Sequence, residues 1–325
     1  MALFVKGTRA LLYIEPNAGS APIVQVIQTA REHVDLNVYY LSSRSILSVL
    51  SEAVHRGVRV RIILDEKPYG MPQSSVRREF EQAKATGATV RAAPARFEMS
   101  RSAHRYVFDH AKYVCNGHQC EIGSANYDWS AFHRNREYLW VSRDPNIVNA
   151  AENVFNADWR GAQAPAQVRT WLVLSPGAKQ PILTMISQPG AVEIESEEMG
   201  SDRPILQALE AKGSTARVIL PSTISSQDRR NAEALVRHGV QVRLMPKATV
   251  YIHAKIILGN QWSFLGSQNF SASSLNENRE MGVVLAGPAT VAARQQFAQD
   301  WSAAQPLAAV SDTQRRKRWH RMSHG

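Results

Sequence analysis

The apolar residues of this chain follow two periodicities in alternation. Short apolar runs, which are typical of buried strands, occupy 11–14, 36–40 and 58–64. Between and after them, apolar residues recur every three or four positions over 23–34, 45–56 and 75–85, which predicts amphipathic helices. Strands that alternate with helices form βαβ units. The pattern therefore predicts an α/β fold whose sheet is largely parallel and is covered by helices on both faces.

The sequence contains an internal repeat. Residues 110–137 and 253–280 align without a gap, and 10 of the 28 positions are identical. The polar residues that recur at equal spacing are His110, Lys112, Ser124, Asn126 and Glu137 in the first copy and His253, Lys255, Ser267, Asn269 and Glu280 in the second. A polar Ala/Pro/Gln stretch at 160–169 is typical of a linker. We therefore expect one half at 1–160, a second at 170–305, and a basic, disordered tail at 306–325.

Each copy changes its pattern after the histidine. Strands are predicted at 113–115 and 118–122 in the first copy, and at 256–258 and 261–265 in the second. The dipeptides between them, Asn116-Gly117 and Gly259-Asn260, are typical of two-residue hairpin turns. Hairpins add antiparallel strands, so we expect mixed sheets. Closing helices are predicted at 146–159 and 289–303.

Cys115 and Cys120 are the only cysteines of the chain. If Asn116-Gly117 is the turn, Cys115 faces His118 and Cys120 lies on the diagonal, ~7–8 Å away. That spacing is too wide for an undistorted disulfide, so we expect two free thiols. The start of the chain is typical of a strand rather than of a secretion signal, and free thiols are typical of a reducing cytoplasm. A zinc site at these residues lacks a fourth ligand, so we expect no metal there.

The paired polar residues indicate phosphoryl-transfer chemistry. On a strand, residues two apart share a face, so His110 projects with Lys112 and His253 with Lys255. Imidazole titrates near ~6.5, so one ring can attack while the other donates a proton. Lysine binds phosphate as a compact charge. A phosphodiester resists cleavage because its negative charge repels nucleophiles and its alkoxide is a poor leaving group. Two such sets around one pocket would overcome both difficulties, since the lysines offset the charge and a protonated histidine gives the leaving oxygen a proton.

The two HxK segments, each followed by GSxN and a glutamate, resemble the phospholipase D superfamily over about 300 of the 325 residues. The resemblance implies two pseudo-symmetric α/β sandwich halves with mixed sheets and the active site at their interface. It also implies a covalent phosphohistidine intermediate, with no metal and no cofactor. One histidine would attack, and the other would act as acid and then as base. Asn126 and Asn269 would join the lysines on the phosphate oxygens, with Ser124 and Ser267 as secondary substrate contacts.

The chain departs from the family pattern at one position in each copy. The family carries an aspartate seven residues after the histidine, where this chain has Gly117 and Asn260. Tyrosyl-DNA phosphodiesterases resemble this chain in lacking that aspartate. A nucleophilic histidine still needs an acceptor for its second N–H. Glu137 and Glu280 are the candidates for this orienting role.

The charge and one long insertion bear on the substrate. The formal net charge of +10 favours anionic partners. The segment at 93–109 is longer than its counterpart in the second copy and should overhang the pocket. It carries the basic and aromatic residues Arg96, Phe97, Arg101, Arg105, Tyr106 and Phe108, together with Met99. Such residues could stack on bases, lie at a lipid interface, or pack as a lid on their own core. The five basic residues within 315–321 could bind anionic lipid or nucleic acid, or be a solvated terminus.

We therefore predict a monomeric, cytoplasmic phosphodiesterase that hydrolyses phospholipid headgroup esters to phosphatidate and an alcohol, in contact with a membrane surface. A metal-independent endonuclease of the same superfamily is the alternative enzyme. A cardiolipin synthase is disfavoured, because those proteins usually carry N-terminal membrane helices. The alternative from another class is a catalytically dead module that binds anionic lipid or nucleic acid. The sequence leaves open which histidine attacks.

Overall fold

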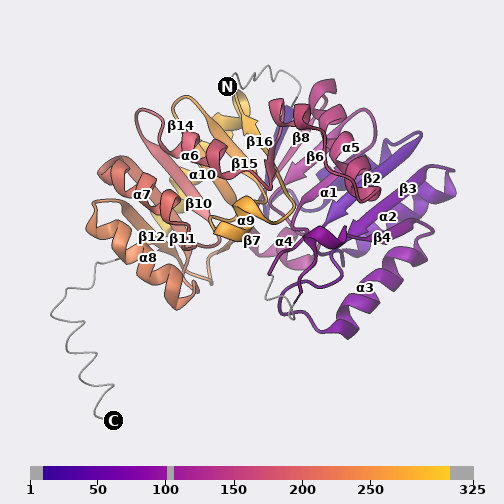
Figure 1. Cartoon of the computed structure of the whole chain (residues 1–325), viewed down its shortest axis with the longest axis horizontal. Coiled ribbons are helices and arrows are strands. Elements are labelled where there is room, and N and C mark those ends of the chain that lie inside the picture. The colour runs from indigo at the N-terminus through magenta and orange to yellow at the C-terminus, as the bar shows by residue number, and fades with distance from the viewer. Residues whose placement is uncertain (1–9, 101–105, 308–325) are drawn as a thin grey trace, which may run out of the picture.

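The computed structural model describes residues 10–100 and 106–307. It places two α/β halves side by side, the first on the right of Figure 1 and the second on the left. The strand predicted at the start of the chain, Arg101, Arg105 and the basic residues of the tail lie outside the described residues. Within the described ranges, no helix combines the length and the apolar character that crossing a membrane requires.

The first sheet contains seven strands, all from residues before the midpoint of the chain. Their spatial order is β1 (Ala10–Ile14), β8 (Tyr138–Ser142), β6 (Cys120–Gly123), β5 (Lys112–Cys115), β2 (His33–Val38), β3 (Arg59–Leu64) and β4 (Thr89–Ala92). Strands β2, β3 and β4 are parallel, and the other neighbouring pairs are antiparallel. The sheet is therefore mixed, as the sequence predicts.

The second sheet repeats this arrangement with eight strands. Their order is β17 (Gln305–Pro306), β12 (Gln241–Met245), β11 (Ala216–Pro221), β10 (Val192–Ser196), β14 (Lys255–Gly259), β15 (Ser263–Gly266), β16 (Glu280–Leu285) and β9 (Val173–Ser175). Strands β10, β11 and β12 are parallel, as their counterparts in the first sheet are. The two pseudo-symmetric halves predicted from the repeat are thus confirmed.

Helices cover both sheets. In the first half they are α1 (Ala21–Gln28), α2 (Arg44–His55), α3 (Gln73–Ala85), α4 (Trp129–His133) and α5 (Pro145–Trp159). In the second half they are α6 (Lys179–Ile186), α7 (Arg203–Lys212), α8 (Ser226–Arg237), α9 (Ala272–Asn276) and α10 (Pro288–Ala303). Short 3₁₀ turns are η1 (Ala95–Phe97), η2 (Ala166–Thr170) and η3 (Gly213–Thr215).

The helix predicted at 23–34 is too long. Helix α1 ends at Gln28, and β2 begins at His33. Thr29 caps the helix, and its hydroxyl donates to the carbonyl of Gln25 at 2.8 Å. The apolar residue Val34, which we assigned to the helix, lies buried in β2 instead. The periodicity argument fails here because a short connection brings the first strand residue into helical spacing.

One apolar core crosses from one half to the other. A cluster of buried side chains joins β5, β6 and α5 of the first half to β14, β16 and α10 of the second. Phe155 of α5 and Phe297 of α10 are completely buried in it. Burying such a side chain contributes about 1.5–3 kcal/mol. The two halves therefore form one packed body, and each depends on the other to cover its inner face.

Both hairpin turns lie one residue later than the sequence predicts. Cys115 of β5 lies opposite Cys120 of β6. The amide of Asn116 donates to the carbonyl of Gln119 at 3.1 Å, so Gly117 and His118 are the central turn residues. Gly117 has φ of +81°, the conformation that a type II′ turn requires at its first central position. In the second half, Asn260 and Gln261 are central, because Gly259 pairs with Trp262.

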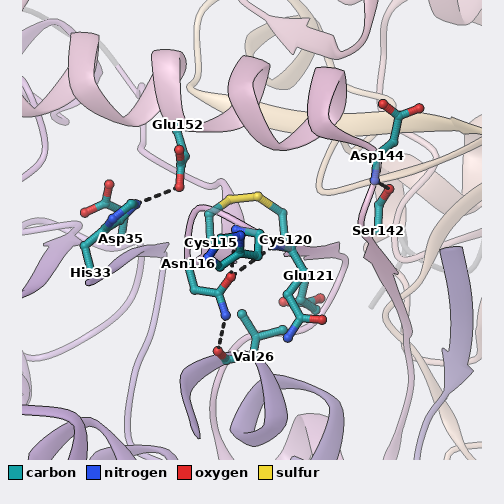
Figure 2. The surroundings of a disulfide bond; sticks show 12 residues. Val26, His33, Asp35, Cys115, Asn116, Cys120, Glu121, Ser142, Asp144 and Glu152 are labelled. Carbon is teal, nitrogen blue, oxygen red and sulfur yellow. Dashed lines mark hydrogen bonds and ion pairs between the residues drawn. A yellow bond between two sulfur atoms is a disulfide. The ribbon is translucent and has the colours of Figure 1, made fainter. Parts of the chain in front are cut away.

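This shift overturns the prediction of free thiols. Cys115 and Cys120 form a disulfide with a Cα–Cα distance of 4.2 Å (Figure 2). Directly opposite residues on antiparallel strands lie within disulfide reach, whereas diagonal ones do not. Asn116 anchors the turn to α1 through a hydrogen bond from its side chain to the carbonyl of Val26 at 2.7 Å (Figure 2). The cysteines therefore give no support for a reducing compartment.

Candidate active site at the interface of the halves

The segment before each histidine pairs with the Asn-Arg-Glu segment of the other half. Strand β13 (Tyr251–Ile252) runs parallel to β7 (Asn135–Arg136) in a two-stranded sheet that joins the halves. The symmetric contact is a bridge between Asp109 and Arg279, next to which the amide of His110 donates to the Arg279 carbonyl at 2.8 Å. This exchange of segments brings both HxK motifs to the interface.

Two buried arginine clamps fix the exchange. Arg279 of the second half holds the carboxylate of Asp158, at the end of α5, through two bonds of 2.7 and 2.9 Å. Arg136 of the first half holds Asp300 of α10 through two bonds of 2.7 and 3.0 Å. All four side chains are at most 8% exposed. Bidentate charge-assisted pairs are strong and geometrically specific, so they fix the relative position of the halves.

Each histidine contacts a glutamate from the opposite half. Nδ1 of His110 is 3.0 Å from Oε2 of Glu280, and Nδ1 of His253 is 2.6 Å from Oε1 of Glu137. Both glutamates are fully buried. The two residues named as acceptors from the sequence therefore do lie against the imidazoles. The sequence does not reveal that the pairs cross the interface.

Hydrogen bonds hold the two glutamates in place. Ser124 donates to Glu137 at 2.6 Å. Ser274, which we did not single out, donates to Glu280 at 2.6 Å. Ser267 is buried and contacts the backbone of Met281, with its Oγ 3.1 Å from the amide nitrogen. Both predicted serines thus already have protein partners, and a direct contact with a substrate stays a prediction.

The two lysines lie completely buried behind the histidines. Lys112 donates to the carbonyl of His110 at 2.8 Å, and Lys255 donates to the carbonyl of His253 at 2.6 Å. Burial lowers the pKa of Lys112 to about 7, aided by the charge of Lys255 and opposed by Glu280. An ammonium so poorly compensated gains much from an incoming anion. This arrangement suits a phosphate group.

Asn126 and Asn269 each present an unsatisfied carboxamide. The Oδ1 atoms of both residues are buried and have no hydrogen-bond partner within the described residues. Eight other buried side-chain atoms of the described residues are unpaired as well, but within the repeated segments at 110–137 and 253–280 only these two occupy equivalent positions. An amide offers a donor in place of the oxygen by a flip of its side chain. Their placement agrees with phosphate binding, which stays a prediction.

The two half-sites differ at one equivalent position. Val38 pairs with Lys112 and Ser196 with Lys255, so the residues that follow, Tyr39 and Glu197, correspond. The Tyr39 ring lies edge-on to His110, with 4.7 Å between the ring centroids. We did not single out either residue in the sequence. The predicted strand at 36–40 included Tyr39, and no strand was predicted before Glu197, so only the structure shows that both residues follow a strand paired with an HxK strand.

Glu197 binds both members of the second HxK motif. Its Oε2 accepts from Lys255 Nζ at 2.7 Å and lies 3.3 Å from Nε2 of His253. Burial alone would raise the pKa of Glu197, but the charges of His253 and Lys255 outweigh it and hold that pKa well below its usual range. Glu197 is therefore ionised at neutral pH. His253 therefore lies between the carboxylates of Glu137 and Glu197, with the Lys255 ammonium 3.4 Å from its Nδ1.

His110 has the opposite electrostatic environment. Burial lowers its pKa, although Glu280 opposes this effect. Its Nδ1 faces Glu280, and none of the described residues contacts its Nε2 through a hydrogen bond or an ion pair. A neutral imidazole whose Nδ1–H is held by a carboxylate carries its lone pair on Nε2. The geometry therefore makes His110 the more nucleophilic of the two rings.

Part of the long segment before the first histidine, at 93–109, packs at the interface between the two halves. Arg96 donates to Asp158 at 2.7 Å, and Phe97 is buried beneath the guanidinium of Arg279, 4.5 Å from its ring centroid. The prediction that this segment overhangs the pocket is therefore wrong for Arg96 and Phe97, which support the Arg279–Asp158 clamp instead. Phe108 does contact the Tyr39 ring edge-on, with centroids 6.2 Å apart.

A separate group of possible metal ligands lies near the disulfide (Figure 2). The ligand atoms of His33, Asp35 and Glu152 lie within 4.8 Å of one another. His33 is already paired with Glu152 at 2.8 Å, and Asp35 is held by two bonds from Arg61 at 2.7 and 2.8 Å. These contacts account for the cluster as a structural ion-pair network.

Fold and site together define a protein of two similar halves, each of which supplies an HxK motif to their common interface. The chain matches the family model described as "Cardiolipin synthase, PLD-like domain" over residues 23–159 and 190–301. These segments make up more than half of the chain, and the protein belongs to this phospholipase D-like family. No curated protein matches the chain.

Solved structures share the fold at low sequence identity. Phosphatidylserine synthase from Haemophilus influenzae is 12% identical, with a TM-score of 0.66 over 94% of this chain and 89% of that one. Polyphosphate kinase from Porphyromonas gingivalis is 14% identical, with a TM-score of 0.64 over 90% of this chain. This chain spans about half of the kinase, covering 49% of its length. The phospholipase D family member Nuc from Salmonella typhimurium is 18% identical, with a TM-score of 0.40 over 48% of this chain and 97% of that one.

Proposed function

We propose that the protein hydrolyses phospholipid headgroup esters to phosphatidate and an alcohol through a covalent phosphohistidine. The reciprocal His–Glu pairs carry the proposal, because they bring two imidazoles from different halves to one interface, where the charges of the two buried lysines act on each other. The family model, whose description names a phospholipid synthase, supports a lipid substrate. Phospholipid at a membrane surface is the partner that this function requires.

In the first step, Nε2 of His110 attacks phosphorus and the bond to the headgroup oxygen breaks. Glu280 accepts the Nδ1–H of His110 and stabilises the positive charge that the ring acquires. His253 donates its Nε2 proton to the leaving oxygen, so the alcohol departs neutral. Lys112 and Lys255 offset the charge on the transferring phosphoryl group.

In the second step, His253 is neutral and takes a proton from a water molecule. The hydroxide attacks phosphorus, the N–P bond to His110 breaks, and phosphatidate is released. His253 regains its proton and His110 its lone pair, so the site is restored. Glu137 stays beside His253 through both steps, with its Oε1 2.6 Å from Nδ1 of the ring as an ion-pair contact.

Release of ethanolamine from vesicles in EDTA tests this mechanism. We expect His110→Ala and His253→Ala each to lower the rate by at least about 10³-fold, because each removes a group used in both steps. His118→Ala, in the exposed hairpin turn, is the matched control and should retain the rate. With ³²P-labelled phosphatidylethanolamine, the unmodified protein should form a labelled phosphatidyl-histidine, and His110→Ala should form none because it lacks the attacking ring. Unchanged activity in either of the first two variants would refute the shared site.

A groove beside the pocket favours an endonuclease as the second candidate. The groove measures about 850 Å³ and is lined by residues that include His133, Arg134, Lys247 and Tyr251. At its edge the Trp129 ring is 54% exposed, stacks on His133 and lies beneath the guanidinium of Arg134. Cationic and aromatic side chains together bind single-stranded nucleic acid.

Nicking of plasmid in EDTA tests the second candidate. If the groove binds DNA, Trp129→Ala should lower nicking relative to lipid hydrolysis by about 10-fold, the effect expected for losing one stacked base. Lipid hydrolysis without nicking would reject the endonuclease. Binding of lipid or DNA without any cleavage would show a catalytically dead module and reject both enzymes.

A further inference from the structure

The pocket has two chemically different sides, and we propose that Glu197 recognises a cationic nitrogen in the leaving headgroup. The substrate class is then a zwitterionic phosphodiester, in which a primary or quaternary ammonium lies close to the phosphate. The inference rests on the proposed function. It starts from the exchange of one residue, because Glu197 stands where the first half has Tyr39.

Glu197 lies where the leaving group must be. Nδ1 of His253 is held by Glu137, so Nε2 is the nitrogen that can protonate the leaving oxygen. That oxygen has to come within about 2.6–3.2 Å of Nε2. Oε2 of Glu197 is itself 3.3 Å from Nε2. The headgroup atoms next to the leaving oxygen are therefore within reach of the Glu197 carboxylate.

The Lys255–Glu197 ion pair is the electrostatic complement of a zwitterion. In the free protein the two charges satisfy each other at 2.7 Å. When a phosphate binds, Lys255 pairs with it, and Glu197 keeps its contact with His253. That contact loses its positive charge when His253 gives its proton to the leaving oxygen. An ammonium on the headgroup then supplies a positive charge to the Glu197 carboxylate, which is three-quarters buried.

An aromatic face adjoins the carboxylate. Tyr251 is half-buried, and its ring centroid lies 6.3 Å from that of His253. Burial, together with the nearby charge of Glu197, raises the pKa of Tyr251, so the phenol stays neutral. A carboxylate beside a tyrosine ring is a favourable environment for an ammonium group.

The opposite side of the pocket suits the part of the substrate that stays bound. Tyr39 packs edge-on against His110, and Phe108 packs against both Tyr39 and Tyr69 with ring centroids 6.2 and 6.4 Å apart. These rings form an apolar wall next to the attacking histidine. The substrate is thus oriented with its diacylglycerol over the first half and its headgroup over the second.

A binding comparison tests the inference without catalysis. His110→Ala cannot form the covalent intermediate, so calorimetry can measure its affinity for soluble diesters. We expect glycerophosphoethanolamine to bind about 10-fold more tightly than glycerophosphoglycerol, which lacks the ammonium. Adding Glu197→Gln should bring the ratio close to one. The inference is overturned if the ratio is already one, or if Glu197→Gln leaves it unchanged.

A kinetic comparison covers the case in which His110→Ala fails to fold. For Glu197→Gln alone, we expect the ratio of kcat/KM on phosphatidylethanolamine to that on phosphatidylmethanol to fall by about 10-fold. Glu32→Gln, on the exposed surface, is the matched control and should keep the ratio. Equal loss on both lipids would show that Glu197 only positions His253 and would overturn the inference. If the unmodified protein cleaves neither lipid, the proposed function fails, and the binding comparison alone decides the inference.

Discussion

At the scale of single residues, the site is determined by which carboxylates face each imidazole. His110 faces Glu280 alone, whereas His253 lies between Glu137 and Glu197. Chemically identical side chains therefore acquire different surroundings, and at His110 burial lowers the pKa of the imidazole although Glu280 opposes this effect. The repeat cannot show this difference, because it aligns the two histidines as equals.

The pH profile of kcat/KM should be narrow and acidic for this chemistry. His110 must be neutral to attack, and burial lowers its pKa, so the acidic limb lies below the usual imidazole value of ~6.5. Lys112 must be charged, and its pKa is about 7, so activity falls as the pH rises through that value. Hydrolysis of bis(4-nitrophenyl) phosphate measured from pH 4 to 9 checks both limbs.

Replacing Glu280 by glutamine should move both limbs in the same direction. Glu280 raises the pKa of His110 and that of Lys112, so Glu280→Gln lowers both values and shifts the profile to lower pH. The maximal rate should also fall by about 10²-fold, because the attacking ring loses its ionic partner. A profile of unchanged position and height would reject the orienting role of Glu280.

At the scale of elements, the sequence predicts most strands and helices but misplaces features that depend on the exact register of two strands. The strand at 58–64 and the closing helices match β3, α5 and α10 within two residues of their ends. The hairpins were placed one residue early, because Asn-Gly and Gly-His are both acceptable at the centre of a tight turn. The disulfide was missed for that reason alone, since register decides whether two strand residues are opposite or diagonal.

The position of the turn predicts that a side chain at Gly117 lowers the stability of the fold. Its φ of +81° is a conformation that residues with a Cβ adopt with strain, and a Cβ there would lie 3.1 Å from the His33 ring. We expect Gly117→Ala to lower the free energy of unfolding by about 1–2 kcal/mol in urea denaturation. His118→Ala at the next position, which is exposed, should leave stability within about 0.5 kcal/mol. Equal stabilities of the two variants would contradict the type II′ turn.

At the scale of the whole molecule, catalysis requires the halves to be joined crosswise. Each HxK strand takes its carboxylate and an added strand segment from the other half, and the Arg136–Asp300 and Arg279–Asp158 clamps fix that exchange. The sequence already contained both parts, as Asn-Arg-Glu and Asp-Trp recur in each copy. Their pairing could not be predicted, because an internal repeat is equally compatible with contacts within a half and between halves.

Breaking one clamp should therefore affect stability and catalysis together. Arg279→Ala leaves the buried carboxylate of Asp158 with a weaker set of partners, and we expect it to lower the free energy of unfolding by about 3–5 kcal/mol. Because the Arg279 backbone is bonded to His110 and the next residue is Glu280, the same variant should lower kcat as well. Arg203→Ala removes an arginine that is 65% exposed from a surface ion pair and should cost less than about 1 kcal/mol.

The comparison separates a clamp between halves from a local ion pair. If the Arg279–Asp158 clamp has no effect on the distance between His110 and Glu280, Arg279→Ala should leave the pH profile of the folded protein unchanged. If it sets the distance between His110 and Glu280, the folded variant should show the acid-shifted profile expected for Glu280→Gln, because in both variants the imidazole loses its carboxylate. A profile measured at a temperature where both variants are fully folded decides between these outcomes, and an unshifted profile would show that the apolar core alone holds the half-sites together.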